Sequence, residues 1–156
     1  MSASKNEVIS AIRESRQQIE EAALSLPETA WSTGVYENGW TAKQLLCHLA
    51  ADASLASVQI TVAKARSPGP GPSFDQDAFN AVQVAARQGM PVSDLLNELH
   101  SNSEQSIAAV EAASDDLLAE PVQLPDAPQG PLGDVILEAV REHNATHLAD
   151  LRSAAR

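Results

Sequence analysis

The chain has 156 residues, 44% of them apolar, and a net charge of −11, so we expect one domain (residues 1–156) with a single hydrophobic core. The acidic excess argues against binding to nucleic acid or to an anionic membrane surface, since both need clustered Lys and Arg. One cysteine excludes an internal disulfide. The N-terminus does not resemble a signal peptide, and no apolar run approaches the roughly 20 residues that span a bilayer. These features favour the cytoplasm.

The first predicted element is a helix over residues 4–26. Its apolar residues recur at heptad-like spacing, and Pro27 ends it. Only 3% of the residues are aromatic, so the core must be built from Ala, Leu, Val and Ile. This composition is typical of closely packed helices.

A second helix is predicted over residues 42–66, and its start carries the clearest signal in the sequence. Thr41 suits the N-cap position, and Gln44 three residues later completes a capping box. Trp40 and Leu45 occupy the two positions of a hydrophobic staple.

The remaining elements follow from Pro- and Gly-rich interruptions of helical periodicity. Residues 67–72 (SPGPGP) should break the second helix, and a short helix over 75–87 should follow. A further helix begins near Ser93 and continues past Val110, and the last runs from about Leu132 nearly to the C-terminus. Residues 114–131 contain four prolines and are expected to form a long connection, and no segment alternates as a strand does. The prediction is an all-α four-helix bundle with an extra short helix between the second and third long helices.

The four histidines are the candidate functional residues. His143 and His147 form an H-x-x-x-H pair, which places two imidazoles one helical turn apart, within reach of one zinc-sized ion. At about 100° per residue, both lie in the middle of the apolar stripe of the last helix, beside Ile136 and Val140. Burying two imidazoles is costly unless each finds a partner. A shared divalent ion would satisfy both; two core histidines bonded to the backbone or to carboxylates are the alternative.

A third ligand could come from either remaining histidine. His48 and Asp52 border the apolar face of the second helix, and His100 borders that of the third long helix; periodicity favours His48 over His100. Asp52 is a candidate fourth ligand, a carboxylate that orients an imidazole, or a general base, with a solvated position as the alternative. Asp150 invites the same interpretation. Cys47 lies about 100° from His48 around the helix and is interpreted as a packing residue.

Three short motifs resemble the DinB/YfiT-like family. The second helix begins Trp-Thr-x-x-x-Leu-Leu-x-His-Leu, and the last helix contains Glu-His-x-x-x-His-Leu. The short helix contains Ala-Phe-Asn, which resembles the mycothiol-dependent maleylpyruvate isomerase branch of that family. The order and lengths of the helices agree, so the resemblance covers nearly the whole chain. The residues that carry it are Trp40, Thr41, Leu45, Leu46, His48, Leu49, Ala78, Phe79, Asn80, Glu142, His143, His147 and Leu148.

The resemblance implies a bundle of the DinB/YfiT type that binds one divalent ion per chain, zinc or nickel, through His48, His143 and His147, and it sets His100 aside. It also implies a homodimer that uses a low-molecular-weight thiol such as mycothiol, bacillithiol or glutathione. Three histidine ligands leave a coordination position open, which is typical of catalytic rather than structural zinc sites. A thiol bound there would be held as thiolate, and a bound water would be acidified.

The resulting hypothesis is a metal-dependent transferase, isomerase or hydrolase that acts on a small molecule, with Asp52 as its candidate catalytic residue. Residues 67–87 and 120–131 are expected to shape the mouth of its pocket. The alternative is a metal-bound helical module with a binding, sensing or detoxification role and no turnover. A fourth protein ligand that closes the metal would favour this alternative, and a site without metal would leave a dimerising bundle with vestigial histidines.

Overall fold

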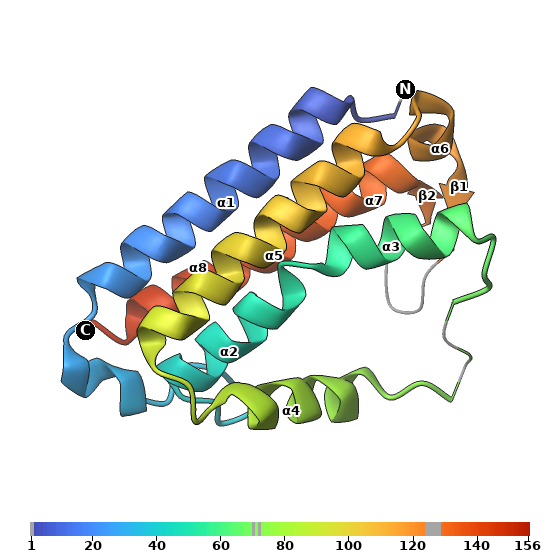
Figure 1. Cartoon of the computed structure of the whole chain (residues 1–156). Helices are drawn as coiled ribbons and strands as arrows, with labels where there is room; N and C mark the ends of the chain where they lie inside the picture. The colour runs from blue at the N-terminus through green and yellow to red at the C-terminus, as the bar shows by residue number, and fades with distance from the viewer. Residues whose placement is uncertain (1, 70, 72, 124–128) are drawn as a thin grey trace.

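Four long helical stretches lie side by side in the computed structural model, which describes residues 2–69, 71, 73–123 and 129–156 (Figure 1). α4 (Gln76–Arg87) is the extra short helix and packs against the second stretch. The predicted all-α four-helix bundle is confirmed. The four stretches are α1 (Lys5–Ser25), α2 (Ala42–Asp52) continued by α3 (Leu55–Lys64), α5 (Val92–Ala112), and α7 (Leu132–Glu138) continued by η2 (Ala139–His143) and α8 (Asn144–Ser153).

The helices begin where the local sequence signals are strongest. Ser4 and Glu7 form a capping box at the start of α1, and Thr41 and Gln44 form the predicted box at the start of α2. Asp75 accepts a hydrogen bond from a first-turn amide and caps α4. At the ends with such signals the predicted and observed bounds differ by only a residue or two. The polar loop after α1 contains a short 3₁₀ helix, η1 (Glu28–Ser32).

The predicted helix over residues 42–66 is two helices, α2 and α3, which meet at a break at Ala53 and Ser54. Two side chains of α5 bind backbone oxygens beside this break. Asn102 Nδ2 donates to the carbonyl of Ala50 at 2.9 Å, and Ser106 Oγ donates to that of Ala53 at 2.7 Å. In a continuous helix these carbonyls would accept hydrogen bonds from amides of the same helix. Here they accept them from side chains of α5 instead, so the break costs little free energy in lost hydrogen bonds.

The stretch Ala42–Lys64 also corrects the expectation that no segment is apolar enough to span a bilayer. Its mean hydropathy of 1.4 over a sufficient length passes that test by composition alone. Composition alone is a weak indication of a membrane span here, because 44% of the most apolar part of this stretch is buried within the protein, as in the core helix of a soluble bundle. The break after Asp52 also divides the stretch into two shorter helices.

The last helix is interrupted, contrary to the prediction of one continuous α-helix from Leu132. Its middle segment, η2, is π-helical. A π-turn holds about one residue more than an α-turn, so side chains beyond it are turned by about 100° from where a 3.6-residue period predicts them. Both histidines of the H-x-x-x-H pair lie at or beyond this segment.

The connection over residues 114–131 has more structure than predicted. It contains α6 (Asp115–Ala119) and a two-stranded antiparallel ribbon in which β1 (Pro121–Val122) pairs with β2 (Gly130–Pro131). The prediction that the chain has no strands is therefore wrong for this connection. Strands of two residues are too short to show an alternation of apolar and polar side chains. Residues 124–128, with two of the four prolines, and Pro70 and Pro72 of the predicted breaker lie outside the described residues.

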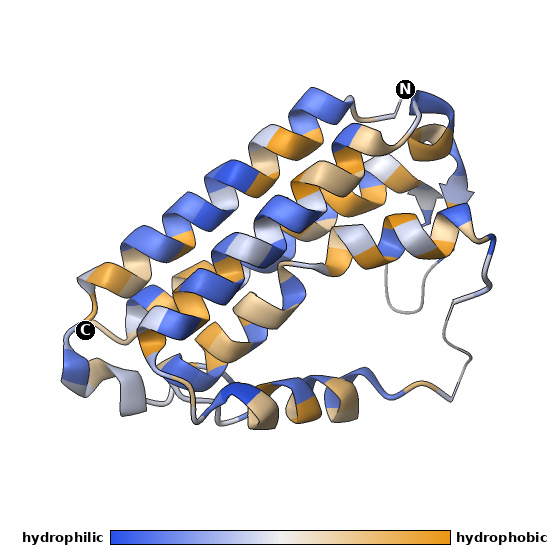
Figure 2. Cartoon of the chain, in the orientation of Figure 1, coloured by the Kyte–Doolittle hydropathy of each residue, from blue (hydrophilic) through white to orange (hydrophobic). Residues whose placement is uncertain are grey.

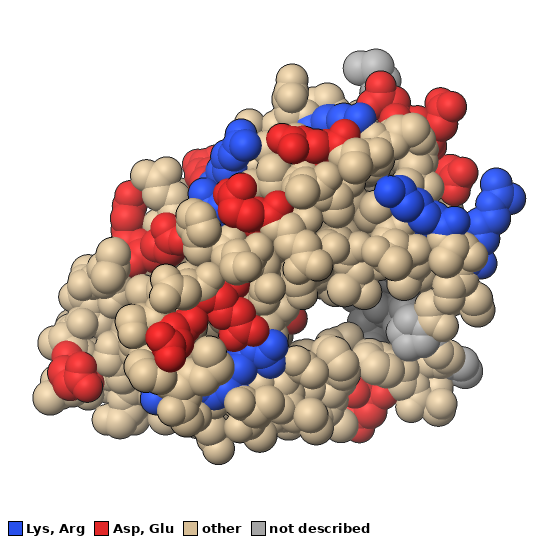
Figure 3. All heavy atoms as spheres, in the orientation of Figure 1, with Lys and Arg blue, Asp and Glu red and all other residues tan. Residues whose placement is uncertain are grey.

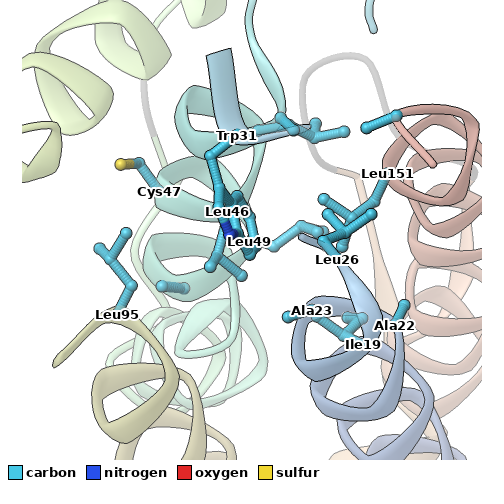
Figure 4. Close-up of a cluster of buried hydrophobic side chains, with 14 of the residues drawn as sticks. Ile19, Ala22, Ala23, Leu26, Trp31, Leu46, Cys47, Leu49, Leu95 and Leu151 are labelled. Atoms are coloured by element: carbon cyan, nitrogen blue, oxygen red, sulfur yellow. The ribbon is translucent and has the colours of Figure 1, made fainter. Parts of the chain in front are cut away.

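Aliphatic side chains hold the helices together, as the composition predicts. Figure 2 shows apolar residues gathered on the inward faces of the helices, and they form two buried clusters. In one cluster Ile19 and Ala23 of α1 face Leu49 of α2 and Leu151 of α8 (Figure 4). Each fully buried Leu or Ile contributes about 1.5–3 kcal/mol, so this packing fixes α2 and α8 against each other. These two helices carry the histidines described next.

Candidate metal centre

Three imidazoles from distant parts of the sequence converge between α2 and the last helix. One ring nitrogen from each of His48, His143 and His147 lies within 4.8 Å of the other two. The Nε2 atoms of His48 and His143 are 3.3 Å apart. The ring centroids of His143 and His147 are 4.4 Å apart, and those of His48 and His147 are 5.0 Å apart. The structure thus brings together the three histidines that the sequence singled out.

The two histidines of the H-x-x-x-H pair differ in exposure. His147 is 4% exposed, whereas the side chain of His143 is 45% exposed. The prediction that both lie in the middle of the buried stripe is wrong for His143, because the π-helical η2 changes the rotation on which that prediction relied. As a result, His143 lies on the open side of the centre, and His147 lies in its interior.

His48 reaches the centre from a regular helix. The capping box at Thr41 fixes the start of α2, and His48 follows two turns later with only 2% exposure. Its ring packs against that of Trp40, with 5.3 Å between centroids. The Nδ1 atom of His48 is buried without a hydrogen-bond partner among the described residues. Nε2 is the nitrogen that faces the centre, 3.3 Å from Nε2 of His143.

Tyr36 closes the centre on the side of His147, and the sequence interpretation missed it. The two rings meet edge to face, with centroids 5.1 Å apart. Tyr36 is held by a tight turn in which the Gly39 amide donates to the Tyr36 carbonyl at 2.9 Å, and Gly39 has φ of +90°, which favours glycine. The asparagine–glycine pair at 38–39 indicates a turn, but nothing local indicates that the turn reaches the last helix.

Asp52 lies beside two of the imidazoles. Its Oδ2 atom is 3.3 Å from Nε2 of His48 and 3.2 Å from Nε2 of His143. These contacts are inconsistent with the alternative of a freely solvated carboxylate. Asp52 is not part of the group whose ligand atoms all lie within 4.8 Å of one another. A role as proton acceptor or orienting carboxylate fits this position on the edge of the three histidines.

Asp150 is the second carboxylate at the centre, on its interior side. Its Oδ2 atom is 3.6 Å from Nδ1 of His147, and both atoms are buried without hydrogen-bond partners among the described residues. Burial, with repulsion from Glu37, raises the pKa of Asp150. Because Nδ1 of His147 faces this carboxylate, Nε2 is the nitrogen left to bind an ion.

The electrostatics keep the buried imidazoles in the form that binds metal. Burial lowers the pKa of His48, against the opposing effect of Asp52. Burial, with repulsion from His143 and His48, lowers the pKa of His147 to about 4. Both rings are therefore neutral at pH 7, with lone pairs free.

The three residues fit a divalent ion. Two nitrogens bound to one zinc ion at about 2.0–2.1 Å in tetrahedral geometry lie about 3.3–3.4 Å apart, which matches the 3.3 Å between His48 and His143. The donors are imidazole nitrogens, which zinc and nickel accept as ligands. An ion would also explain why the buried rings of His48 and His147 face the same point.

His100 and Cys47 lie away from this centre. His100 is exposed on α5, with Nδ1 at 3.4 Å from a carboxylate oxygen of Glu20 on α1. Cys47 is fully buried in the cluster of Figure 4, and burial raises the pKa of its thiol. The thiol is therefore protonated and packed, in agreement with its interpretation from the sequence.

A cavity of about 600 Å³ lies on the open side of the centre, where Asp52 and His143 form part of its wall. Figure 3 shows the hollow between α4 and the rest of the bundle. Residues 67–87 contribute Phe74, Gln76, Phe79 and Asn80 to the wall, as expected. Of residues 120–131, none that the structure describes lines the cavity, so that part of the expectation is wrong for them.

Known proteins with the same fold include enzymes described as thiol- or metal-dependent. A mycothiol-dependent maleylpyruvate isomerase superposes with a TM-score of 0.76 at 17% identity, over 96% of this chain and 61% of that chain. A histidine-to-alanine mutant of that isomerase gives 0.74 at 16% identity over the same shares. YfiT from Bacillus subtilis, described as a probable metal-dependent hydrolase with an unusual four-helix bundle topology, gives 0.75 at 18% identity, over 99% of this chain and 89% of that chain.

These identities are low, so the superpositions show the fold. No curated protein sequence gives a significant match. The present chain spans 61% of the length of the isomerase that it resembles. The sequence model for the mycothiol maleylpyruvate isomerase N-terminal domain, however, matches residues 12–152, which is most of the chain. The chain therefore belongs to the family of mycothiol maleylpyruvate isomerase N-terminal domains, within the DinB/YfiT-like group.

Proposed function

We propose that the chain is a metal-dependent enzyme that binds one divalent ion, zinc or nickel, through His48, His143 and His147. The observation that carries this proposal is the convergence of three imidazole nitrogens within 4.8 Å beside a cavity of about 600 Å³. Structural zinc sites are usually closed by four protein ligands, whereas three ligands next to a cavity favour catalysis. The reaction class is transfer, isomerisation or hydrolysis of a small molecule.

A divalent ion in this position would supply a Lewis acid that lowers the pKa of a thiol or water entering from the cavity. Asp52 lines that cavity and has Oδ2 within 3.3 Å of two of the imidazoles, so it is placed to accept the proton from such a group. The ring of Tyr36 packs against His147 and that of Trp40 against His48, so these two aromatic side chains cover the buried imidazoles.

The second substrate is proposed to be a low-molecular-weight thiol, of which mycothiol is the first candidate. Family membership supports this choice, as does the mycothiol dependence of the isomerase with the same fold. The alternative is a metal-bound module without turnover, with Asp52 as a fourth ligand. The distances from Asp52 to the imidazoles are compatible with that role also, so the experiment has to separate the two.

The test measures metal and turnover on the same preparations of untagged protein. We expect about one equivalent of zinc or nickel per chain by elemental analysis, lost in His48→Ala and His147→Ala and retained in His100→Ala, the control for a histidine outside the centre. Asp52→Asn should retain the metal and lose about 100-fold or more of any thiol-dependent activity. Loss of metal in Asp52→Asn, with no thiol-dependent turnover in the unsubstituted protein, would favour the non-catalytic alternative. Retention of metal in both His48→Ala and His147→Ala would contradict the proposal.

A further inference from the structure

The cavity beside the metal centre gathers most of the large apolar side chains that are exposed in the described part of the chain. Six such side chains are exposed, and four of them line the cavity: Leu55, Val58, Phe74 and Phe79. The rings of Phe74 and Phe79 pack together, with 5.7 Å between their centroids. Exposed apolar side chains that collect around one concavity, rather than scatter singly, indicate a binding site for an apolar group.

The wall of the same cavity contains a guanidinium group with an unpartnered N–H. Arg16 of α1 lines the cavity, and its side chain is 15% exposed. Its Nε atom is buried without a hydrogen-bond partner among the described residues. A carboxylate oxygen of Glu20 lies 3.8 Å from this atom, which is too far for a hydrogen bond. A buried charged donor without an acceptor is costly, so Nε–H is available to an acceptor that enters the cavity.

The rest of the guanidinium group is held in place by a neighbouring helix. Nη1 of Arg16 donates a hydrogen bond to the carboxylate of Glu104, so the side chain connects α1 to α5. This contact fixes the planar group and leaves Nε–H unused. A ligand that binds to Nε therefore does not have to order a free side chain, which lowers the entropic cost of binding.

Arg16 and the metal centre lie at the same level of the bundle. Ser15, which precedes Arg16, accepts a hydrogen bond of 2.8 Å from Nδ2 of Asn144, which follows His143. All four residues line the cavity. Since their sequence neighbours are in contact, Arg16 and His143 lie around one part of the cavity, within the length of one small molecule.

The charge of the cavity lining does not decide between a neutral and an anionic ligand. Carboxylates of Asp52, Glu138 and Glu142 line the cavity, whereas its described lining contains one guanidinium group, that of Arg16. The divalent ion proposed above would add positive charge beside His143. Because these opposite charges offset each other, the unpartnered Nε–H is the feature that selects a ligand.

We propose that the cavity binds a ligand with an apolar body and one oxygen acceptor, a carbonyl or a carboxylate, and that Nε–H of Arg16 donates a hydrogen bond to this oxygen. The apolar body packs on Phe74 and Phe79, and a cavity of about 600 Å³ has room for both contacts. The part of the ligand next to His143 and Asp52 is then the part that reacts. This inference rests on the proposed function only in taking the cavity as the substrate site.

Probes of the same shape test the hydrogen bond to Nε. They are 2-acetylnaphthalene and 2-isopropenylnaphthalene, in which a methylene group replaces the carbonyl oxygen. Each is titrated into the zinc-loaded full chain, and its Kd is obtained from amide chemical shifts. We expect the ketone to bind at least about tenfold more tightly than the hydrocarbon, because the hydrocarbon leaves Nε–H without an acceptor. The Kd of 2-naphthoate, compared with that of the ketone, identifies whether a carboxylate or a carbonyl is the preferred acceptor.

Arg16→Lys keeps a positive charge that can pair with Glu104 and removes Nε–H. We expect this substitution to weaken binding of the ketone about five- to tenfold and to leave binding of the hydrocarbon unchanged. The hydrocarbon therefore reports whether the cavity of the variant is intact. Arg13→Lys, the same substitution at an exposed position of α1, is the matched control and should change neither Kd.

The Nε–H signal of Arg16 in the unsubstituted protein gives a readout that does not depend on the folding of a variant. The ketone should shift this signal downfield, as donation of a hydrogen bond does. Equal Kd values for ketone and hydrocarbon, equal weakening of both in Arg16→Lys, or an unshifted Arg16 signal at saturating ketone would each overturn the inference. A chain that binds no metal and still prefers the ketone would contradict the proposed function alone, and bound zinc without that preference would contradict this inference alone.

Discussion

α2 and the last helix both contribute to the same cluster of imidazoles, but they do so through different local structures. α2 is a regular helix that starts at a capping box and presents His48 in a fully buried position. The last helix contains the π-helical η2, which leaves His143 half exposed and His147 buried. A regular helix is sufficient to place one imidazole in the core. The irregular helix places one imidazole toward the cavity and another inside, and π-turns are frequent at functional sites.

The largest expected effect comes from removing the irregularity. Deletion of Arg141, an exposed residue of η2, should restore an α-helical period and turn the two histidines relative to α7 by about 100°. We expect the affinity for zinc to fall by more than about 100-fold, since at least one ligand is lost. Competition with a chromophoric chelator measures it, with Arg141→Ala as the control of unchanged length. A deletion variant of unchanged helicity and zinc affinity would show that η2 is irrelevant to binding.

Acid should destabilise the metal-free protein through His147, the buried member of the H-x-x-x-H pair. Burial and the neighbouring histidines lower the pKa of His147 to about 4, from about 6.5 when unfolded. Between these values the unfolded chain binds a proton that the folded chain does not, so stability falls as pH drops from 6.5 towards 4, by as much as about 3 kcal/mol. His48 acts in the same direction, and the raised pKa of Asp150 acts in the opposite one.

Urea unfolding in the presence of a chelator at pH 7 and pH 4.5 checks this prediction. A comparison of the unsubstituted protein with His147→Asn isolates the contribution of His147, because the other groups are common to both. The variant should lose much of the pH dependence, whereas His100→Ala should retain all of it. An identical pH dependence in His147→Asn would contradict the assignment of a neutral, buried imidazole.

Zinc should stabilise the folded chain by about 2.7 kcal/mol at a hundredfold excess over its Kd. The melting temperature should rise at pH 7.5, and the rise should be smaller at pH 5.5, where protons compete for the imidazoles. Because burial lowers the pKa of His48 and of His147, part of the effect should survive at pH 5.5. An equal shift in the His143→Ala/His147→Ala double mutant would mean that the ion binds elsewhere on the acidic surface.

The break between α2 and α3 gives the smallest expected effect. Ser106→Ala removes the hydrogen bond to the Ala53 carbonyl and should cost about 1–2 kcal/mol, since that carbonyl is left without its partner. Asn102→Ala should behave similarly, through the Ala50 carbonyl. The exposed control Ser101→Ala should change stability by less than about 0.5 kcal/mol in the same urea titration. An unchanged free energy of unfolding in Ser106→Ala would indicate that water replaces Ser106 as the hydrogen-bond donor to the Ala53 carbonyl.

Much of the bundle could be predicted because its signals are local. The capping box at Thr41, the breaker after Lys64 and the apolar period of α1 each act within a few residues of the position they specify. The convergence of the three histidines could be predicted from spacing together with family resemblance. The ligand set, the zinc or nickel identity and the homodimer stay predictions.

The remaining features depend on contacts between distant segments. The break after Asp52 relies on Asn102 and Ser106 of another helix, and the position of Tyr36 relies on packing against His147. A constant rotation per residue cannot reveal a π-turn, so the exposure of His143 was predicted wrongly. Sequence periodicity identifies which residues share a helix face only while the helix stays regular.

Anomalous diffraction at the zinc absorption edge, from crystals of the zinc-loaded chain, would locate the ion itself. We expect one strong anomalous peak per chain, within bonding distance of Nε2 of His48, of His143 and of His147. Soaked crystals of the His48→Ala variant should lack that peak. A peak bound only by surface carboxylates, or no peak among the three imidazoles at saturating zinc, would contradict the assignment of a metal centre.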